Sequence, residues 1–197
     1  GNEVLVTDGP AVGKQGTITG EHARLMVHFD EDILQSMTGM DQVVVKTVGR
    51  GLIIHGYEKV VTKKIGPQLM KGWDITIGSD GVLNVPVVAE IPSYLMGSGY
   101  ELPPDFVDQD MMTPDWEELK ALGLQDLKLG DIVAVLDTDH RYSRRYLEGA
   151  VTIALIMHGD SSWLGHGPGC QELMSCVNGE IRPVVDPNCN IGGLLGL

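Results

Sequence analysis

The sequence contains few cysteines, few basic residues and few aromatic residues, and it has no long apolar run. Its three cysteines, Cys170, Cys176 and Cys189, form no CxxC pair, so we expect no disulfide framework and predict a cytoplasmic protein. The sequence has 14 Lys and Arg residues and 27 Asp and Glu residues, which gives a formal net charge of −13. This balance argues against nucleic acid and anionic membranes as partners. No apolar stretch approaches the roughly 20 residues of a transmembrane helix, and no secretory signal pattern is visible.

Length and patterning predict a mainly β protein. A chain of 197 residues can form one large or two small domains. Short β-branched runs recur among its 26 glycines, with little helical periodicity. We predict a small SH3-like barrel over residues 1–64, followed by a β-rich sandwich or barrel domain over residues 65–197 with one or two short helices. Two apolar runs in the later domain, 131–136 and 151–157, predict strands that are buried on both faces.

The first strand-turn-strand segment resembles a known RNA-binding motif. Residues 4–18, VLVTDGPAVGKQGTI, are similar to the KOW motif of the small SH3-like barrels in ribosomal proteins and transcription factors. The resemblance implies a loop that is presented to RNA. Here the loop offers only Lys14 as a base, and tight turns that need positive φ also explain its glycines. We therefore interpret the segment as a structural barrel and expect no nucleic-acid partner.

An acidic segment lies within the later domain. Residues 101–118 carry seven acidic and no basic side chains, which is typical of a long surface loop that is functional or mobile. A short helix is predicted at its end, with Thr113 as the N-cap, Pro114 as the first helical residue and acidic residues in the first turn.

Acidic and histidine side chains gather around the run 151–157. If the preceding strand continues through residue 139, alternation places Asp137 and Asp139 on one face, and His158 and Asp160 share a face after the second strand. We expect the two pairs to meet at one end of the sheet. Carboxylate and imidazole together are ligands that suit a divalent Zn, Mn or Fe ion. The predicted metal ligands are Asp137, His158, Asp160 and His166, and the predicted catalytic groups that move protons are Asp139 and His140.

A glycine-rich loop and an arginine cluster predict an anion site beside these residues. The loop GHGPG at 165–169 precedes the segment 170–176, which we expect to be a short helix whose free N–H groups would hold an anion. Arginines from the neighbouring loop could form bidentate contacts with a carboxylate or a phosphate. The predicted substrate-binding residues are Arg141, Arg144, Arg145, Gly167 and Gly169.

Each of these residues also has a purely structural explanation. Acids and a histidine at a strand end are common in solvated turns, and the arginines have acidic neighbours with which to pair. The spacing matches no metal signature such as HExxH. It is the cluster as a whole that favours a functional site.

The combined pattern resembles a prokaryotic family known only as a domain of unknown function, the four-four-three-eight family. The matching stretches are GNE at 1–3, GKQGTITGEH at 13–22, residues 149–158, GHGPG at 165–169 and DPNCNI at 186–191. The resemblance implies no activity. It does imply a further β-rich segment before residue 1, which would be separate or cleaved here. Residues 151–158 and the loop after them are also similar to acetamidases and formamidases, whose metal-site motifs mix His, Asp and Gly, although the full motif is absent.

Two functional hypotheses follow from these observations. The first is a metal-assisted hydrolase that acts on a small amide, lactone or other anionic small molecule through a metal-activated water. The alternative is a non-catalytic homo-oligomer that binds a small ligand or a partner protein. The apolar tail 191–197 motivates the alternative, since exposed apolar segments usually contact a partner surface.

Overall fold

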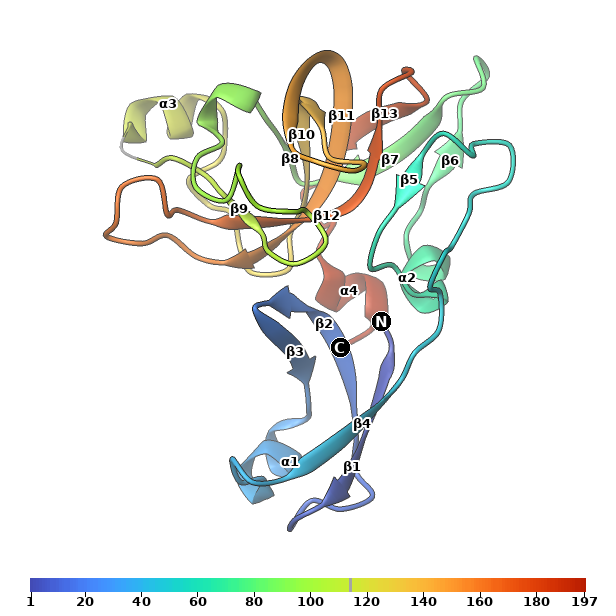
Figure 1. Ribbon diagram of the computed structural model, residues 1–197, viewed down its shortest axis with the longest axis vertical. Helices are drawn as coiled ribbons and strands as arrows, with labels where there is room; N and C mark the ends of the chain where they lie inside the picture. The colour runs from blue at the N-terminus through green and yellow to red at the C-terminus, as the bar shows by residue number, and fades with distance from the viewer. Residues whose placement is uncertain (114) are drawn as a thin grey trace.

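The computed structural model describes residues 1–113 and 115–197. It has two parts that follow one another along its long axis (Figure 1). The lower part is a single sheet formed by the first strands of the chain, and the upper part contains two further sheets. Both ends of the chain lie at the junction of the two parts (Figure 1).

The N-terminal sheet is an open antiparallel sheet. Alternation along its first strand buries Val4 and Val6, which pack with Phe29 and with Ile33 of helix α1 (Glu31–Ser36). In the described part of the chain both β3 and β4 are edge strands. The closure into an SH3-like barrel that was predicted for residues 1–64 is therefore not found. The strands are β1 (Glu3–Asp8), β2 (Gln15–His22), β3 (Arg24–His28) and β4 (Gln42–Lys46), in the order β3-β2-β1-β4.

The second sheet is built around two long strands. β10 (Ile132–Asp139) and β11 (Arg145–His158) form an antiparallel pair. Residues 132–135 and 153–157 are at most 2% exposed, which confirms the prediction of strands buried on both faces. The sheet order is β5-β12-β11-β10-β8, with β9 also paired to β12. The further strands are β5 (Val61–Thr62), β8 (Ala89–Ile91), β9 (Gln109–Asp110) and β12 (Gly169–Cys176).

The segment 170–176 is a strand rather than the predicted helix. It forms most of β12, which pairs along its length with β11 on one side and with β5 and β9 on the other. Every residue of β12 is buried, and the sheet supplies its backbone hydrogen bonds. The helix N-terminus that was expected to bind an anion after 165–169 is thus absent from this described segment.

A third sheet packs on one face of the second sheet. Val85 from the third sheet and Leu155 and Leu173 from the second sheet belong to one buried core. The other face of the second sheet is covered by α3 (Trp116–Ala121) and the 3₁₀ helix η1 (Ser93–Leu95). The predicted mainly β fold class is confirmed. The strands of the third sheet are β6 (Thr76–Ile77), β7 (Leu83–Val87) and β13 (Ile181–Val185), in the order β13-β7-β6.

The C-terminal tail is folded against the rest of the protein. It forms helix α4 (Ile191–Leu195), which begins with Ile191 buried in the core and packs on α2 (Pro67–Gly72). Gly72 permits this contact, because a Cβ atom there would overlap the carbonyl group of Leu194. The tail is therefore not the free apolar segment that suggested an oligomer, and homo-oligomerisation stays a prediction.

The helix predicted after the acidic segment is α3, but a different residue caps it. The side chain of Asp115 accepts a hydrogen bond from the backbone N–H of Glu118 at 3.1 Å. The hydroxyl of Thr113, the predicted cap, instead donates to Asp160 at 2.6 Å. Pro114 lies outside the described residues.

Two simpler expectations concern the cysteines and membrane helices. Cys170, Cys176 and Cys189 are all buried and free of disulfide bonds. In the ranges that the structure describes, no helix is long and apolar enough to cross a membrane.

Candidate metal centre

Asp139, predicted to move protons, lies in an ion-pair cluster with two of the predicted substrate-binding arginines. Its carboxylate accepts hydrogen bonds from Arg141 Nε and Arg145 Nε, each at 2.9 Å. Burial raises the pKa of Asp139, but the hydrogen bonds from the two arginines outweigh burial and lower the pKa to about 2. A carboxylate held in its charged form is a poor proton acceptor. Arg141 and Arg145 are both already bound to Asp139.

The sheet does not bring Asp137 and Asp139 to His158. β10 and β11 run antiparallel, so Asp139 pairs with Arg145 at the start of β11, whereas His158 ends β11. The expectation that both pairs meet at one sheet end is therefore wrong. Asp137 sits at a bulge in β10 with φ of 54°, and its carboxylate accepts the N–H of Gly149 at 2.8 Å. It shapes the hairpin.

His140 and Arg144 are buried beside the carboxylate of Glu172 on β12. His140 Nδ1 and Arg144 Nε lie 2.9 Å and 2.7 Å from Glu172 Oε1. Arg144 also donates to the backbone carbonyls of Gly99 and Val107. Its side chain is fully buried, so it holds the loop 99–107 against the sheet and offers no free donor to a substrate.

Asp160 and Gly167 also make structural contacts. Besides Thr113, Asp160 accepts the N–H of Ser161 at 2.8 Å. The N–H of Gly167 donates to the carbonyl of Met111 at 2.9 Å, and a Cβ atom at Gly167 would lie 2.6 Å from that same oxygen. These two residues position the loop after β11, and neither contributes to the cluster of ligand atoms described next.

Three side chains from distant segments converge where the two parts of the molecule meet. His22 ends β2, Asp108 precedes β9 and His158 ends β11. Asp108 Oδ2 lies 3.1 Å from His22 Nδ1 and 3.0 Å from His158 Nε2, and the three atoms all lie within 4.8 Å of one another. Two ligands of a tetrahedral zinc ion, each about 2.0–2.1 Å from the metal, lie roughly 3.4 Å apart. The observed spacing therefore fits ligands that share one ion.

A second carboxylate joins this cluster to His166. Asp110 Oδ1 lies 3.1 Å from His158 Nε2, and Asp110 Oδ2 lies 3.1 Å from His166 Nδ1. The His166 side chain is 44% exposed and stands at the solvent edge, edge-on to Trp163. Of the four predicted metal ligands, the structure thus brings together His158 and His166.

The hydrogen bonds of His158 show why a cation belongs here. Its Nδ1 lies 2.8 Å from the carbonyl oxygen of Gly159, and a carbonyl can only accept, so Nδ1 carries the proton. In a neutral ring, Nε2 would then point a lone pair at the carboxylates of Asp108 and Asp110. That arrangement is stable only with a cation between them, either a proton or a metal ion.

The pKa of His158 reflects the same surroundings. Burial lowers it, but the Gly159 carbonyl and the charges of Asp108 and Asp110 outweigh burial and raise it overall. A histidine that donates its second ring N–H to a backbone carbonyl is also typical of metal ligation, because that bond fixes the tautomer.

Gly169 and Gln171 of β12 lie beside the cluster and position its residues. A Cβ atom at Gly169 would overlap the Asp108 carboxylate and would lie 2.6 Å from His158 Cδ2, so only glycine leaves room for both. Gln171 Nε2 donates to the carbonyl of Glu21 at 2.6 Å, and the N–H of Glu21 donates to Gln171 Oε1 at 3.1 Å. These two bonds hold the end of β2, and with it His22, against β12.

Comparison with known proteins places the chain in a family. The model of DUF4438, a domain of unknown function, matches in two parts, its N-terminal domain over residues 1–71 and its C-terminal domain over residues 72–195. The chain belongs to the DUF4438 family. This DUF4438 chain is similar to a solved protein, described as the crystal structure of TM1086, with 36% identity and a TM-score of 0.90. The match covers 98% of this chain and 68% of that one. None of the curated proteins matches it.

Three members of the cluster in this DUF4438 chain were not predicted from the sequence: His22, Asp108 and Asp110. The two aspartates lie in the acidic segment 101–118, and their alternate positions put both carboxylates on one side of a strand. That pattern could have identified them. His22 belongs to the N-terminal family domain and bonds to a residue 86 positions away, so no local signal marks it.

Proposed function

We propose that this chain is a metal-dependent hydrolase that acts on a small amide, a lactone or a related organic anion. The observation that supports this proposal is the position of Asp108 Oδ2 between His22 Nδ1 and His158 Nε2. Two imidazoles and one carboxylate suit Zn, Mn or Fe, and three protein ligands leave a coordination position for water. His22 is half exposed, so solvent and a small substrate can reach that position.

The residues of the cluster divide the chemistry between them. His22, Asp108 and His158 would hold the metal ion, which lowers the pKa of a bound water to near neutrality. Asp110 accepts the Nδ1–H of His166, which leaves Nε2 of His166 with a free lone pair. His166 can therefore take a proton from the water and return it to the leaving group, which is general acid–base catalysis.

Metal content tests the first half of the proposal. Protein purified without chelators should contain stoichiometric Zn, Mn or Fe by mass spectrometry, and His22→Ala and His158→Ala should both lose it. His28→Ala is the matched control, because His28 is exposed on β3 and pairs only loosely with Asp30. Equal metal content in all four proteins, or none in any, would overturn the proposal.

Activity tests the second half. Proton release from a panel of small amides and lactones should require the metal, stop with a chelator and return when the ion is restored. Ligand sets of two histidines and one carboxylate also serve iron oxygenases. Turnover that requires Fe(II) and consumes O₂, without hydrolysis, would contradict the hydrolase.

A further inference from the structure

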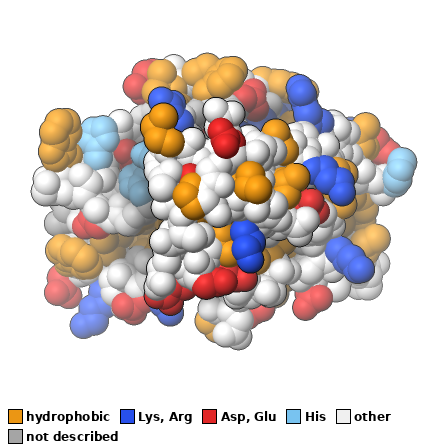
Figure 2. Space-filling model, turned by 90° about the horizontal axis from the view of Figure 1, so that it is seen from below, with side chains coloured by type: hydrophobic (Ala, Val, Ile, Leu, Met, Phe, Trp, Pro, Cys, Tyr) orange, Lys and Arg blue, Asp and Glu red, His pale blue; other side chains and the backbone are white. Residues whose placement is uncertain are grey.

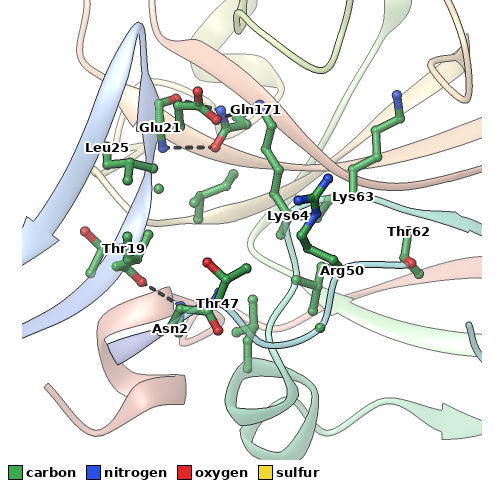
Figure 3. A pocket seen from close by; sticks show the side chains of 18 of the residues that line it. Asn2, Thr19, Glu21, Leu25, Thr47, Arg50, Thr62, Lys63, Lys64 and Gln171 are labelled. Atoms are coloured by element: carbon green, nitrogen blue, oxygen red, sulfur yellow. Dashed lines mark hydrogen bonds and ion pairs between the residues drawn. The ribbon is translucent and has the colours of Figure 1, made fainter. Parts of the chain in front are cut away.

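A cleft of about 630 Å³ lies between the N-terminal sheet and the second sheet. Its exposed apolar side chains are those of Leu25 on β3 and Val48 after β4. Figure 3 shows Arg50, Lys63 and Lys64 along the same side of the cleft. On the face seen from below in Figure 2, by contrast, Lys and Arg side chains are scattered among Asp and Glu. A cleft that gathers three basic residues is therefore unusual in a chain with a net charge of −13.

The backbone turns two consecutive lysines into this cleft. In an extended strand, neighbouring side chains point to opposite faces. Lys64 instead adopts a left-handed conformation with φ of 55°, so that Lys63 and Lys64 both line the cleft. Such a conformation is unfavourable for a residue other than glycine and is concentrated at functional sites. The side chains of Lys63 and Lys64 are 9% and 21% exposed, and their amines pair with Asp105 at 2.6 Å and with Glu21 at 3.2 Å, respectively.

Arg50 is held by a glycine on each side. Gly49 and Gly51 have φ of 98° and 70°, values that favour glycine. A Cβ atom at Gly49 would lie 2.6 Å from the carbonyl oxygen of Ile65, so this glycine also lets the loop approach the cleft wall. Within residues 1–113 and 115–197, no carboxylate lies in ion-pair distance of Arg50. Three cations face two carboxylates here, and the guanidinium remains available to an anion.

The cleft and the metal centre share three chain segments. Glu21 lines the cleft, and the next residue is His22. Asp105 also lines the cleft, three residues before Asp108. The third segment is β12, where Gln171 lines the cleft and lies on the same face of the strand as Gly169. His22, Asp108 and His158 do not themselves line the cleft, which is connected to them through these segments.

We propose that the cleft binds the substrate as an organic anion, with its charged group at Arg50, Lys63 and Lys64 and its apolar part against Leu25 and Val48. Its identification as the substrate's site rests on the proposed hydrolase function, whereas anion binding by the cleft does not. Guanidinium and ammonium groups together suit a carboxylate or a phosphate. The arginines predicted for this role, Arg141, Arg144 and Arg145, are already bound to Asp139 and Glu172.

Calorimetric titration of chelator-treated protein with benzoate and phenyl phosphate tests the inference without any contribution from the metal. At least one of the two should bind, more tightly than benzyl alcohol, which lacks the charge, and inorganic phosphate, which lacks the apolar part. Arg50→Gln should weaken this binding about tenfold, because hydrogen bonds to charged groups are among the stronger ones. Lys14→Gln, in the exposed β1–β2 turn, should leave it unchanged.

The two proposals fail in different ways. His158→Ala should lose the metal and keep anion binding. If neither anion binds, or if Arg50→Gln and Lys14→Gln change binding equally, the cleft proposal is overturned, even where metal and hydrolysis are intact. If the anions bind as expected but no metal is found, anion binding by the cleft stands, whereas the hydrolase and the cleft's identification as its substrate site do not.

Discussion

Replacing Gly169 with alanine should greatly weaken metal binding while leaving the fold intact. The added Cβ atom would lie 2.6 Å from His158 Cδ2, whereas carbon atoms in contact are about 3.5 Å or more apart, so the ring must move by about 1 Å. Metal ligands tolerate displacements of only about 0.2 Å. We expect metal affinity to fall by about 100-fold or more, which corresponds to roughly 2.7 kcal/mol. Competition with a chromophoric chelator measures this loss.

Gly159→Ala is the matched control for this substitution. Gly159 neighbours the same cluster, but a Cβ atom there would meet nothing within 4 Å, and its carbonyl still accepts from His158. Metal affinity should therefore stay at the wild-type value. Thermal unfolding of both metal-free variants checks that the fold is kept. A Gly169→Ala protein that is folded and binds metal as tightly as wild type would refute the assignment of Asp108 and His158 as ligands.

Three further predictions concern His166, Arg144 and Asp139. His166→Ala should keep its metal but lose about 10²- to 10⁴-fold in kcat, the usual contribution of a general base, and loss of metal instead would make His166 a ligand. Arg144→Met should lower the free energy of unfolding in urea by about 3 kcal/mol, because the buried Glu172 then keeps only His140 as a charged partner; a change below about 1 kcal/mol would contradict this. Because the pKa of Asp139 is lowered from 3.8 to about 2, its ionised form stabilises the fold above about pH 4, and this contribution is lost as the pH falls through about 2. Urea unfolding of wild type and Asp139→Asn should therefore differ most near neutral pH and converge at low pH, and a constant difference would refute the cause given.

The predictable part of the fold is the part that local pattern determines. Residues 132–136 and 153–157 of the two predicted runs are apolar at every position, and only a strand or a helix buried on all sides suits them. The segment 170–176 is ambiguous by the same measure, since Cys-Gln-Glu-Leu-Met-Ser-Cys has no strand periodicity of its own. Pairing with β11 and β5 decides its structure. Closure of the N-terminal sheet also depends on contacts between β3 and β4, which no local run encodes.

The candidate site shows the same division between local and distant information. His158 and His166 lie close together in the sequence and were predicted to share a site, which they do through Asp110. The expectation for Asp137 and Asp139 failed on topology. The short connection between the two strands requires an antiparallel hairpin, and a hairpin sends the end of its first strand to the start of its second. His22 depends on the docking of two sheets, which a single sequence does not reveal.

The most direct test of the central claim is anomalous diffraction from a crystal of the protein grown with Zn²⁺ or Mn²⁺, with data collected on both sides of the metal's absorption edge. We predict one strong anomalous peak within bonding distance of His22 Nδ1, Asp108 Oδ2 and His158 Nε2. A folded protein with no peak there, or with its metal only at exposed residues such as His28, would contradict it.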